Sequence, residues 1–306
     1  MVNKQIIEQL GTGSVKQPKD IRDFRAEPVF GVVVIDWSKE FRLSEPPNEN
    51  QDGSNSCVSQ AWSYYHWQLT GKNYSRRSLY SRIFLPQSGA YLRDGGKELT
   101  SKGQATRDEA SDPMPQTETA MRLREGITAE EEASDIEQAY YAFQEEVIDY
   151  YAVSIRDYKG VIFGVRGTWQ AWADLTNPVL PTDNNYWYHA LYGMGYHLHN
   201  GQKCIIAKSS WCGTQSGHHE HHIKEDYFKS GGIYNNWVLI PKETKIMIEF
   251  VKNESIPGEY GILVSSKVGT QYVPASTPED LKQRMPNVPV NPDGTIDYSK
   301  ARKIIL

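Results

Sequence analysis

One cysteine, Cys57, has surroundings suited to nucleophilic chemistry. It follows a turn-rich loop at 45–56 (EPPNENQDGSNS) and opens a stretch, 57–70, that contains neither Gly nor Pro. A helix N-terminus favours negative charge, and therefore favours the thiolate, which is the reactive form of a cysteine. Gln51 has a side-chain amide that can stabilise a developing oxyanion. A thiol nucleophile also needs a base, and His189, about 130 residues downstream, is the candidate.

This effect requires a helix that begins at the cysteine. The sequence predicts one over 57–70, ending at Gly71. Apolar residues recur there at three- and four-residue steps, at Val58, Ala61, Trp62, Tyr65 and Leu69. A second helix is expected at 78–85. A further helix should begin at the capping box that Thr128 forms with Glu131. One face of this last helix would carry Ile136, Tyr140, Phe143 and Val147.

Beyond Asp149 the pattern changes to short β-like runs. These are YYAVSI, GVIFGV, KCIIAK and NWVLI, and His189 begins another strand-like segment. The chain is therefore helix-rich first and strand-rich second. This order predicts an α+β protein with two lobes.

Together these residues resemble the papain-like (C1-type) cysteine peptidases, in which a cysteine near the mature N-terminus is followed by a distant histidine. The matching segments are Ser54 to Val58 around the cysteine, His189, the K-S-S-W stretch at 208–211, and an upstream I-D-W at 35–37. The resemblance extends over residues 35–240. Because the N-terminal arm is too short for a folded prodomain, the chain is most similar to divergent bacterial and phage members.

The resemblance implies a fold and a set of roles. The family folds into a helical lobe and a β-barrel-like lobe with the active-site cleft between them. Cys57 would be the nucleophile and His189 the general base and later acid. Gln51 and the Cys57 backbone N–H would form the oxyanion hole, and Trp211 would shield the contact that orients the histidine. The implied function is hydrolysis of peptide bonds through an acyl-enzyme.

This chain departs from the family at Ser209, Val58 and Ser54, and at Cys212, where the family normally has glycine. Ser209 stands where the family has the asparagine that orients the histidine, and a hydroxyl is shorter with a single donor. Val58 replaces the aromatic residue after the nucleophile, and Ser54 replaces a half-cystine. The alternative function is accordingly a papain-fold structural or assembly protein, such as a phage virion component, with a degenerate site.

Substrate contacts are expected beside the nucleophile and base. Tyr188 would line a cleft for an extended peptide, although ordinary core packing explains most tyrosines. Gly95 and Gly96, in an expected turn at 94–96, would contact substrate as well. The segment 107–149 holds 13 acidic and 3 basic residues. It predicts either a solvated helix face or an acidic wall that favours basic substrates.

A histidine-rich run, HHEHH, contains His218, His219, His221 and His222. Two histidines at i and i+4 on a helix would suit zinc. The resemblance, however, places the run on a turn and a strand, where successive side chains alternate between faces. We therefore expect no metal and no cofactor, and sensing of acidic pH is the other possible use.

Composition excludes several classes. The 306 residues carry a net charge of −5, which disfavours non-specific nucleic-acid binding. No run approaches the roughly 18 apolar residues of a membrane span, and the N-terminus lacks the apolar core of a secretion signal. Three cysteines cannot form a disulfide framework. We interpret Cys204 as packing and Cys212 as incidental. The expected location is a reducing compartment, the cytoplasm of a bacterial host, or a phage particle.

The expected organisation is an arm at 1–30, a papain-like domain at 31–241 and a C-terminal extension at 242–306. Within the domain, the helical lobe would end near 127. The extension should hold one more strand pair, then a Pro-rich stretch and the basic peptide YSKARKIIL. Such a tail is either a docking arm for a protein assembly or disordered. The expected partner of the site is a polypeptide substrate.

Overall fold

In the computed structural model the chain forms two compact units. The first comprises residues 1–25 and 35–241, and the second comprises 26–34 and 242–306. Residues 26–34 thus belong with the C-terminal segment, whereas the sequence divided them between the arm and the domain. The structure describes residues 13–18, 20, 23–30, 33–87, 89–168, 170–174, 176–182, 186–211, 220–242, 247–266, 269–275, 277–285 and 288–304.

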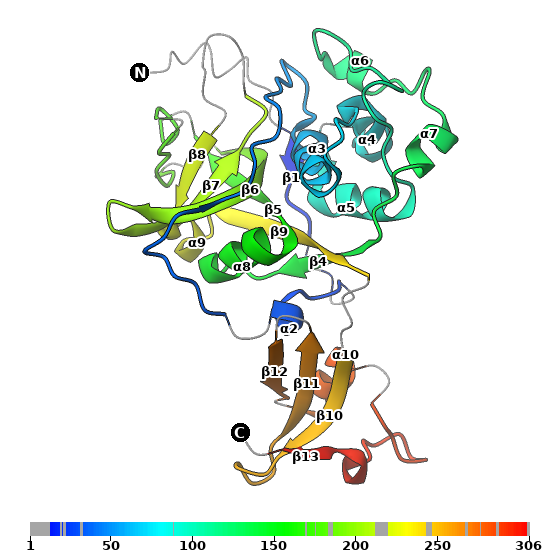
Figure 1. Cartoon of the computed structure of the whole chain (residues 1–306), viewed down its shortest axis with the longest axis vertical. Helices are drawn as coiled ribbons and strands as arrows, with labels where there is room; N and C mark the ends of the chain where they lie inside the picture. The colour runs from blue at the N-terminus through cyan, green and yellow to red at the C-terminus, as the bar shows by residue number, and fades with distance from the viewer. Residues whose placement is uncertain are drawn as a thin grey trace. The chain divides into compact units, whose positions relative to one another are not determined.

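The helical lobe of the first unit is built around helix α3 (Cys57–Thr70), as predicted. Residues 57–66 are buried, and Gly71 closes the helix in the left-handed conformation at φ +77°. Shorter helices complete this lobe (Figure 1): α4 (Arg76–Ile83), α5 (Leu92–Ser101), α6 (Glu118–Met121) and α7 (Ala129–Ala133). A short strand β3 (Ala90–Tyr91) pairs in parallel with β1 (Ser14–Val15).

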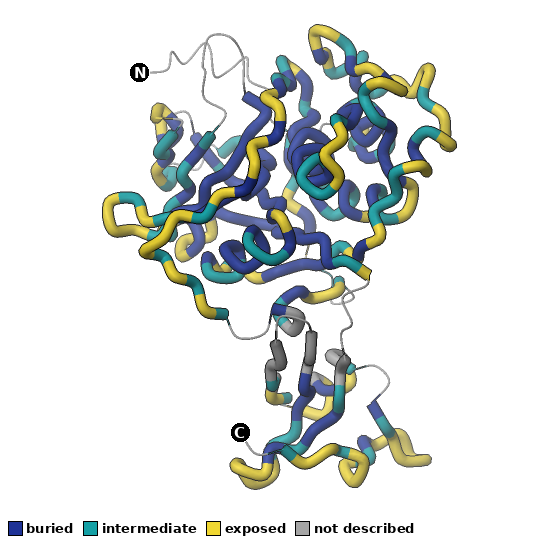
Figure 2. Tube along the Cα trace, in the orientation of Figure 1, coloured by how far each residue is buried: buried dark blue, intermediate teal, exposed yellow. Residues whose placement is uncertain are grey.

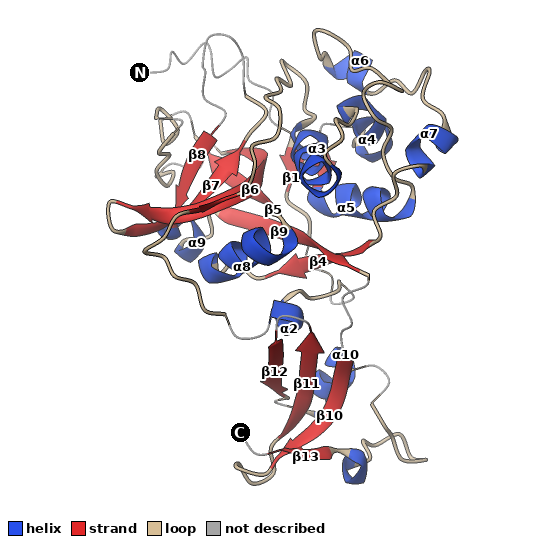
Figure 3. Ribbon diagram, viewed as in Figure 1, coloured by secondary structure: helices blue, strands red, loops and turns tan. Residues whose placement is uncertain are grey.

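The second lobe is an antiparallel sheet in the order β4-β9-β5-β6-β7-β8, with β2 also paired to β6. Its strands are β2 (Phe41–Arg42), β4 (Ala139–Gln144), β5 (Val161–Gly167), β6 (Trp187–His199), β7 (Gln202–Lys208), β8 (Glu220–Lys224) and β9 (Ile233–Pro241). Helices α8 (Ile148–Tyr158) and α9 (Glu225–Lys229) complete the lobe (Figure 3). The predicted α+β class is confirmed.

The predictions for the two segments on either side of Asp149 are wrong. The capping box at Thr128 is present, but the helix that it begins ends at Ala133. Residues 139–144 instead form β4, because they pair in register with 236–241 of β9. Conversely, the run at 150–155, expected as a strand, lies in α8, where buried side chains at 151, 152, 155 and 158 follow the helical period.

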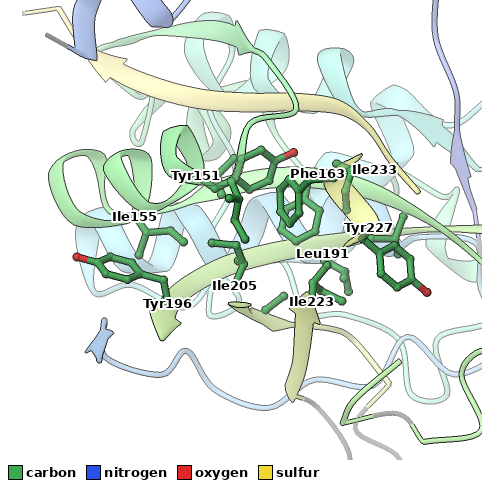
Figure 4. Close-up of a cluster of buried hydrophobic side chains, with 14 of the residues drawn as sticks. Tyr151, Ile155, Phe163, Leu191, Tyr196, Ile205, Ile223, Tyr227 and Ile233 are labelled. Atoms are coloured by element: carbon green, nitrogen blue, oxygen red, sulfur yellow. The ribbon is translucent and has the colours of Figure 1, made fainter. Parts of the chain in front are cut away.

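The main core of this lobe lies between α8 and the sheet (Figure 4). Tyr151 and Ile155 of α8 face Phe163, Leu191 and Ile205 of the strands. The rings of Tyr151 and Phe163 meet edge to face at 5.2 Å. Each fully buried apolar side chain of this size contributes about 1.5–3 kcal/mol relative to an exposed one. Most residues of β5, β6 and β7 are buried (Figure 2), so these strands contribute much of the core.

Two acidic residues of segment 107–149, Glu132 and Asp112, are buried in ion pairs and hydrogen bonds. They belong neither to the predicted solvated helix face nor to an acidic surface that would bind basic substrates. Glu132 is 3% exposed and pairs with Arg82 at 2.6 Å and with Arg124 at 2.9 Å. The carboxylate of buried Asp112 accepts from the Ser75 hydroxyl. These charges hold the helices of the lobe together, since a buried carboxylate needs partners.

The second unit is folded, whereas the sequence indicated one strand pair and an extended tail. Its sheet has the order β12-β11-β10-β13. The elements are α2 (Glu27–Phe30), β10 (Met247–Asn253), β11 (Tyr260–Ser266), β12 (Gly269–Pro274), α10 (Pro278–Arg284), the 3-10 helix η1 (Tyr298–Lys300) and β13 (Arg302–Ile304). Its own core contains Phe250, Ile262, Leu281, Val288 and Ile296. In neither unit does the described chain contain a helix long and apolar enough to cross a membrane.

Candidate active site

Cys57 is the first residue of α3 and is fully buried. The preceding loop is held from two sides. The hydroxyls of Ser54 and Ser56 are hydrogen-bonded at 2.8 Å, and the Asn55 N–H donates to Glu118 at 2.7 Å. These contacts fix the point at which the chain enters the helix. They place the thiol at the positive end of the helix dipole.

The sulfur of Cys57 lies among backbone N–H groups of three elements. Burial raises the pKa of the Cys57 thiol to about 12, and the N–H groups of Ala190, Val58 and Ser14 act in the opposite direction. The thiol is therefore protonated in this structure. The contact with Ala190 of β6 brings the sulfur to the residue that follows His189 in the chain.

His189 is the third residue of β6 and faces Val165 of β5 across the sheet. It is fully buried. Its ring stacks on Trp211 with centroids 3.9 Å apart and planes at 21°. Trp187 and Trp172 meet Trp211 edge to face at 5.3 and 5.9 Å. The indole of Trp211 thus covers the imidazole on one side and is itself held in place by aromatic neighbours.

Both ring nitrogens of His189 lack a hydrogen-bond partner among the described residues. Ser209, which stands at the position of the orienting asparagine, is also buried, but its hydroxyl accepts from the Trp211 N–H at 3.3 Å. Burial, and then the nearby His221, lower the pKa of His189 well below its ordinary value. Stacking on Trp211, rather than a hydrogen bond from Ser209, fixes the ring in this structure.

Gln51 is buried and held by two elements. Its backbone N–H donates to the Ser210 carbonyl at 3.0 Å, and its side-chain oxygen accepts from the Ser210 hydroxyl. Its amide nitrogen donates to the Ser54 carbonyl at 2.7 Å. An amide nitrogen has two N–H groups, and this contact uses one of them. The N–H of Cys57, at the first turn of α3, has no acceptor within the helix.

A segment of the N-terminal arm crosses this site. The Gly13 N–H donates to the Tyr188 carbonyl at 3.2 Å, and the Ala90 N–H donates to the Gly13 carbonyl at 2.8 Å. The strand β1 that follows (dark blue in Figure 1) therefore lies between β3 and β6, with Ser14 against the Cys57 sulfur. A Cβ on Gly13 would lie 2.2 Å from the Asn55 carbonyl oxygen, so only glycine fits.

Of the residues expected to contact substrate, Tyr188 contacts the arm segment, whereas Gly95 and Gly96 lie inside a helix. Tyr188 is half-buried beside Tyr234, and its carbonyl accepts from the arm. Gly95 and Gly96 are not in a turn, and that prediction is wrong. Both lie inside α5, where a Cβ on Gly95 would meet the Trp62 ring at 2.1 Å. Their lack of side chains serves helix packing.

Gly89 and Ala90, and not Gly95 or Gly96, contact the arm segment. A Cβ on Gly89 would meet the Gly13 carbonyl oxygen at 1.7 Å. In the sequence, the glycine in SGAY at 88–91 is the signal for this close approach.

Cys204 and the histidines of the HHEHH run that the structure describes lie on strands β7 and β8 and differ in burial. Cys204 is buried in β7, and burial raises the pKa of its thiol. His221 is buried near Trp172, with ring centroids 5.1 Å apart, whereas His222 is partly exposed on β8. The two do alternate between faces, as the strand interpretation requires. Cys212, His218 and His219 lie outside the described residues.

Comparison with solved structures decides the fold. Xylellain, a cysteine protease from Xylella fastidiosa, matches with a TM-score of 0.62 at 19% identity, over 76% of this chain and 97% of that one. The fold is papain-like. Procathepsin L2 proteinase from the Tenebrio molitor larval midgut matches with a TM-score of 0.60 at 14% identity, over 78% of this chain and 81% of that one.

A cysteine protease from Carica candamarcensis, in complex with E-64, also shares the papain-like fold. It matches with a TM-score of 0.51 at 14% identity, over 67% of this chain and 99% of that one. No family profile and no curated protein matches the sequence. The similarity is therefore one of fold, and the function must be argued from the site.

Proposed function

We propose that the protein is a cysteine peptidase with Cys57 as nucleophile and His189 as general base. The observation that carries the proposal is the position of the Cys57 sulfur. It lies at the N-terminus of a buried helix and against the N–H of Ala190, the residue that follows His189, whose ring is covered by Trp211. A thiol placed only for packing needs neither a helix N-terminus nor a shielded histidine.

The chemistry follows from these positions. His189 takes the proton of Cys57, and the thiolate attacks the carbonyl carbon of the scissile peptide. The oxygen that becomes negative accepts from the Cys57 N–H and from the second side-chain N–H of Gln51. His189 then gives its proton to the leaving amine. Water, deprotonated by His189, hydrolyses the thioester and restores the thiol.

We further propose that an extended peptide binds along the path of residues 13–15. That path offers a carbonyl acceptor from Tyr188 on one wall and an N–H donor from Ala90 on the other. Main-chain groups on two sides recognise extended peptides of many sequences. It follows that the arm excludes substrate while it is bound, and that the buried, protonated thiol belongs to this closed state.

A thiol-directed peptidyl electrophile tests the proposal. At neutral pH, with sites identified by mass spectrometry, we expect labelling at Cys57 that is lost in Cys57→Ala and falls at least about a hundredfold in His189→Ala, since general-base assistance contributes about 10²–10⁴. Cys204 is the internal reference for an unactivated thiol. Labelling of Cys57 no faster than that of Cys204, with the arm removed, would favour the non-catalytic papain-fold role instead.

The phage or bacterial assembly role stays a prediction with its own test. The segment 242–306 carries the core residues of the second unit, and its deletion leaves only residues 26–34 of that unit in the chain. If it docks the protein to an assembly, deletion of 242–306 abolishes association measured by light scattering and leaves the Cys57 chemistry intact.

A further inference from the structure

Three histidines converge at one end of the sheet, outside the candidate active site. His197 and His199 come from β6, and His222 comes from β8. One imidazole nitrogen of each lies within 4.8 Å of the others. His197 and His199 are two residues apart on one strand, so their side chains share a face. The sheet brings His222 to that face from the far side of β7.

A carboxylate fixes the protonation of one of these rings. The Nε2 atom of His222 lies 3.1 Å from Glu220, and because a carboxylate only accepts, this nitrogen carries the proton. The lone pair of His222 is then on Nδ1, which points at the Nε2 atom of His197 at 2.7 Å. Glu220 is itself bonded to Arg42, which holds the carboxylate in place.

A carboxylate also backs one ring of the cluster. A zinc-bound histidine usually has its second ring nitrogen bonded to a carboxylate or a carbonyl, and His222 has this arrangement with Glu220.

We propose that His197, His199 and His222 bind a divalent transition-metal ion of the zinc class. With Zn–N distances of about 2.0–2.1 Å, tetrahedral ligand nitrogens lie about 3.3 Å apart. The contact between His197 and His222 would open by about 0.6 Å, and His199 would move inward, both within side-chain rotation. Three imidazoles leave a fourth position for water. The ion would link β6 to β8 across β7.

Zinc titration of the full chain tests the proposal. All titrations use the Cys57→Ser background, so that zinc binding at the active-site thiol does not contribute. After treatment with a chelator, Zn²⁺ is titrated in competition with a chromogenic chelator. We expect one ion per chain and a rise of several degrees in Tm at saturating zinc. Co²⁺ should give the visible absorption of a tetrahedral site.

Variants distinguish specific ligation by these three histidines from non-specific binding of zinc by surface histidines. His222→Gln should abolish the high-affinity ion. Glu220→Gln, which keeps all three ligands, should weaken binding about 10- to 100-fold, the usual effect of removing a supporting carboxylate. The control is the double variant His218→Gln, His219→Gln, which removes two histidines of the same run and should bind as the parent does. Equal affinity in His222→Gln and the parent, or loss only in the control, would overturn the proposal. The near-ultraviolet circular dichroism of each metal-free variant shows that it is folded.

Discussion

The substitution Gly13→Ala tests whether the arm gates the nucleophile. The new Cβ would lie 2.2 Å from the Asn55 carbonyl oxygen, more than 1 Å inside ordinary contact. That oxygen is backbone, and the loop carrying it is held by Glu118, so it cannot move away cheaply. Overpacking of this kind costs about 1–3 kcal/mol, and it destabilises only the closed state. Because about 1.4 kcal/mol corresponds to a tenfold change, the open population should rise about 5- to 140-fold.

The assay is the second-order rate of Cys57 alkylation by a small haloacetamide under conditions in which the arm opens and closes faster than the thiol reacts. Gly53→Ala is the matched control, since a Cβ there has nothing within 4 Å. We expect the Gly13→Ala rate to rise by the factor above and the Gly53→Ala rate to equal that of the unchanged protein. A Gly13→Ala rate equal to that of the control would refute the arm as a gate.

Three further predictions concern packing and the histidine. Gly95→Ala gains about 1 kcal/mol of helix propensity, but it drives a Cβ to 2.1 Å from the Trp62 ring at a cost of about 1–3 kcal/mol. We therefore expect a net loss of up to about 2 kcal/mol in the free energy of unfolding, measured in urea; greater stability would show that the Trp62 ring moves aside at little cost. Ser209→Ala should change the rate of Cys57 labelling less than about threefold, because His189 takes no hydrogen bond from it; a loss near that of His189→Ala would make Ser209 the orienting residue. Because the pKa of His189 is lowered in the folded protein, the unfolded chain binds a proton below about pH 6.5 that the folded chain does not. The free energy of unfolding is therefore highest above this pH and falls as the pH drops below it. Urea unfolding between pH 7.5 and 5 should show this slope, and His189→Asn should flatten it; an unchanged slope would assign it to other groups.

The helix behind the cysteine was predictable because its signals are local. The three- and four-residue spacing over 57–70 and the glycine at 71 act within a few residues of each other. The prediction for segment 136–147 was wrong because its structure depends on a distant part of the chain. Its apolar spacing also fits a helix, but pairing of 139–144 with β9, about a hundred residues away, decides that it is a strand.

Motif and order point to Cys57, Gln51, His189 and Trp211 as the site, and their catalytic roles stay predictions. The structure shows the contacts of Gln51 with Ser210, of the Cys57 sulfur with Ala190 and of His189 with Trp211. Nothing local to Gly13 indicates that it crosses the site, since its neighbours Asn55, Gly89 and Tyr188 are far away in the sequence. The same holds for His197 and His222, which meet only through the register of β6, β7 and β8.

Hydrolysis of peptides by the Gly13→Ala protein tests the central claim most directly. A proteome-derived peptide library is incubated with the variant, and new termini are identified by mass spectrometry. We expect new peptide termini that accumulate with time, disappear in the Cys57→Ala and His189→Ala versions of the variant, and are fewer with the unchanged arm. No new termini above those of the Cys57→Ala protein, with Cys57 shown to be accessible to alkylation, would contradict the assignment as a peptidase.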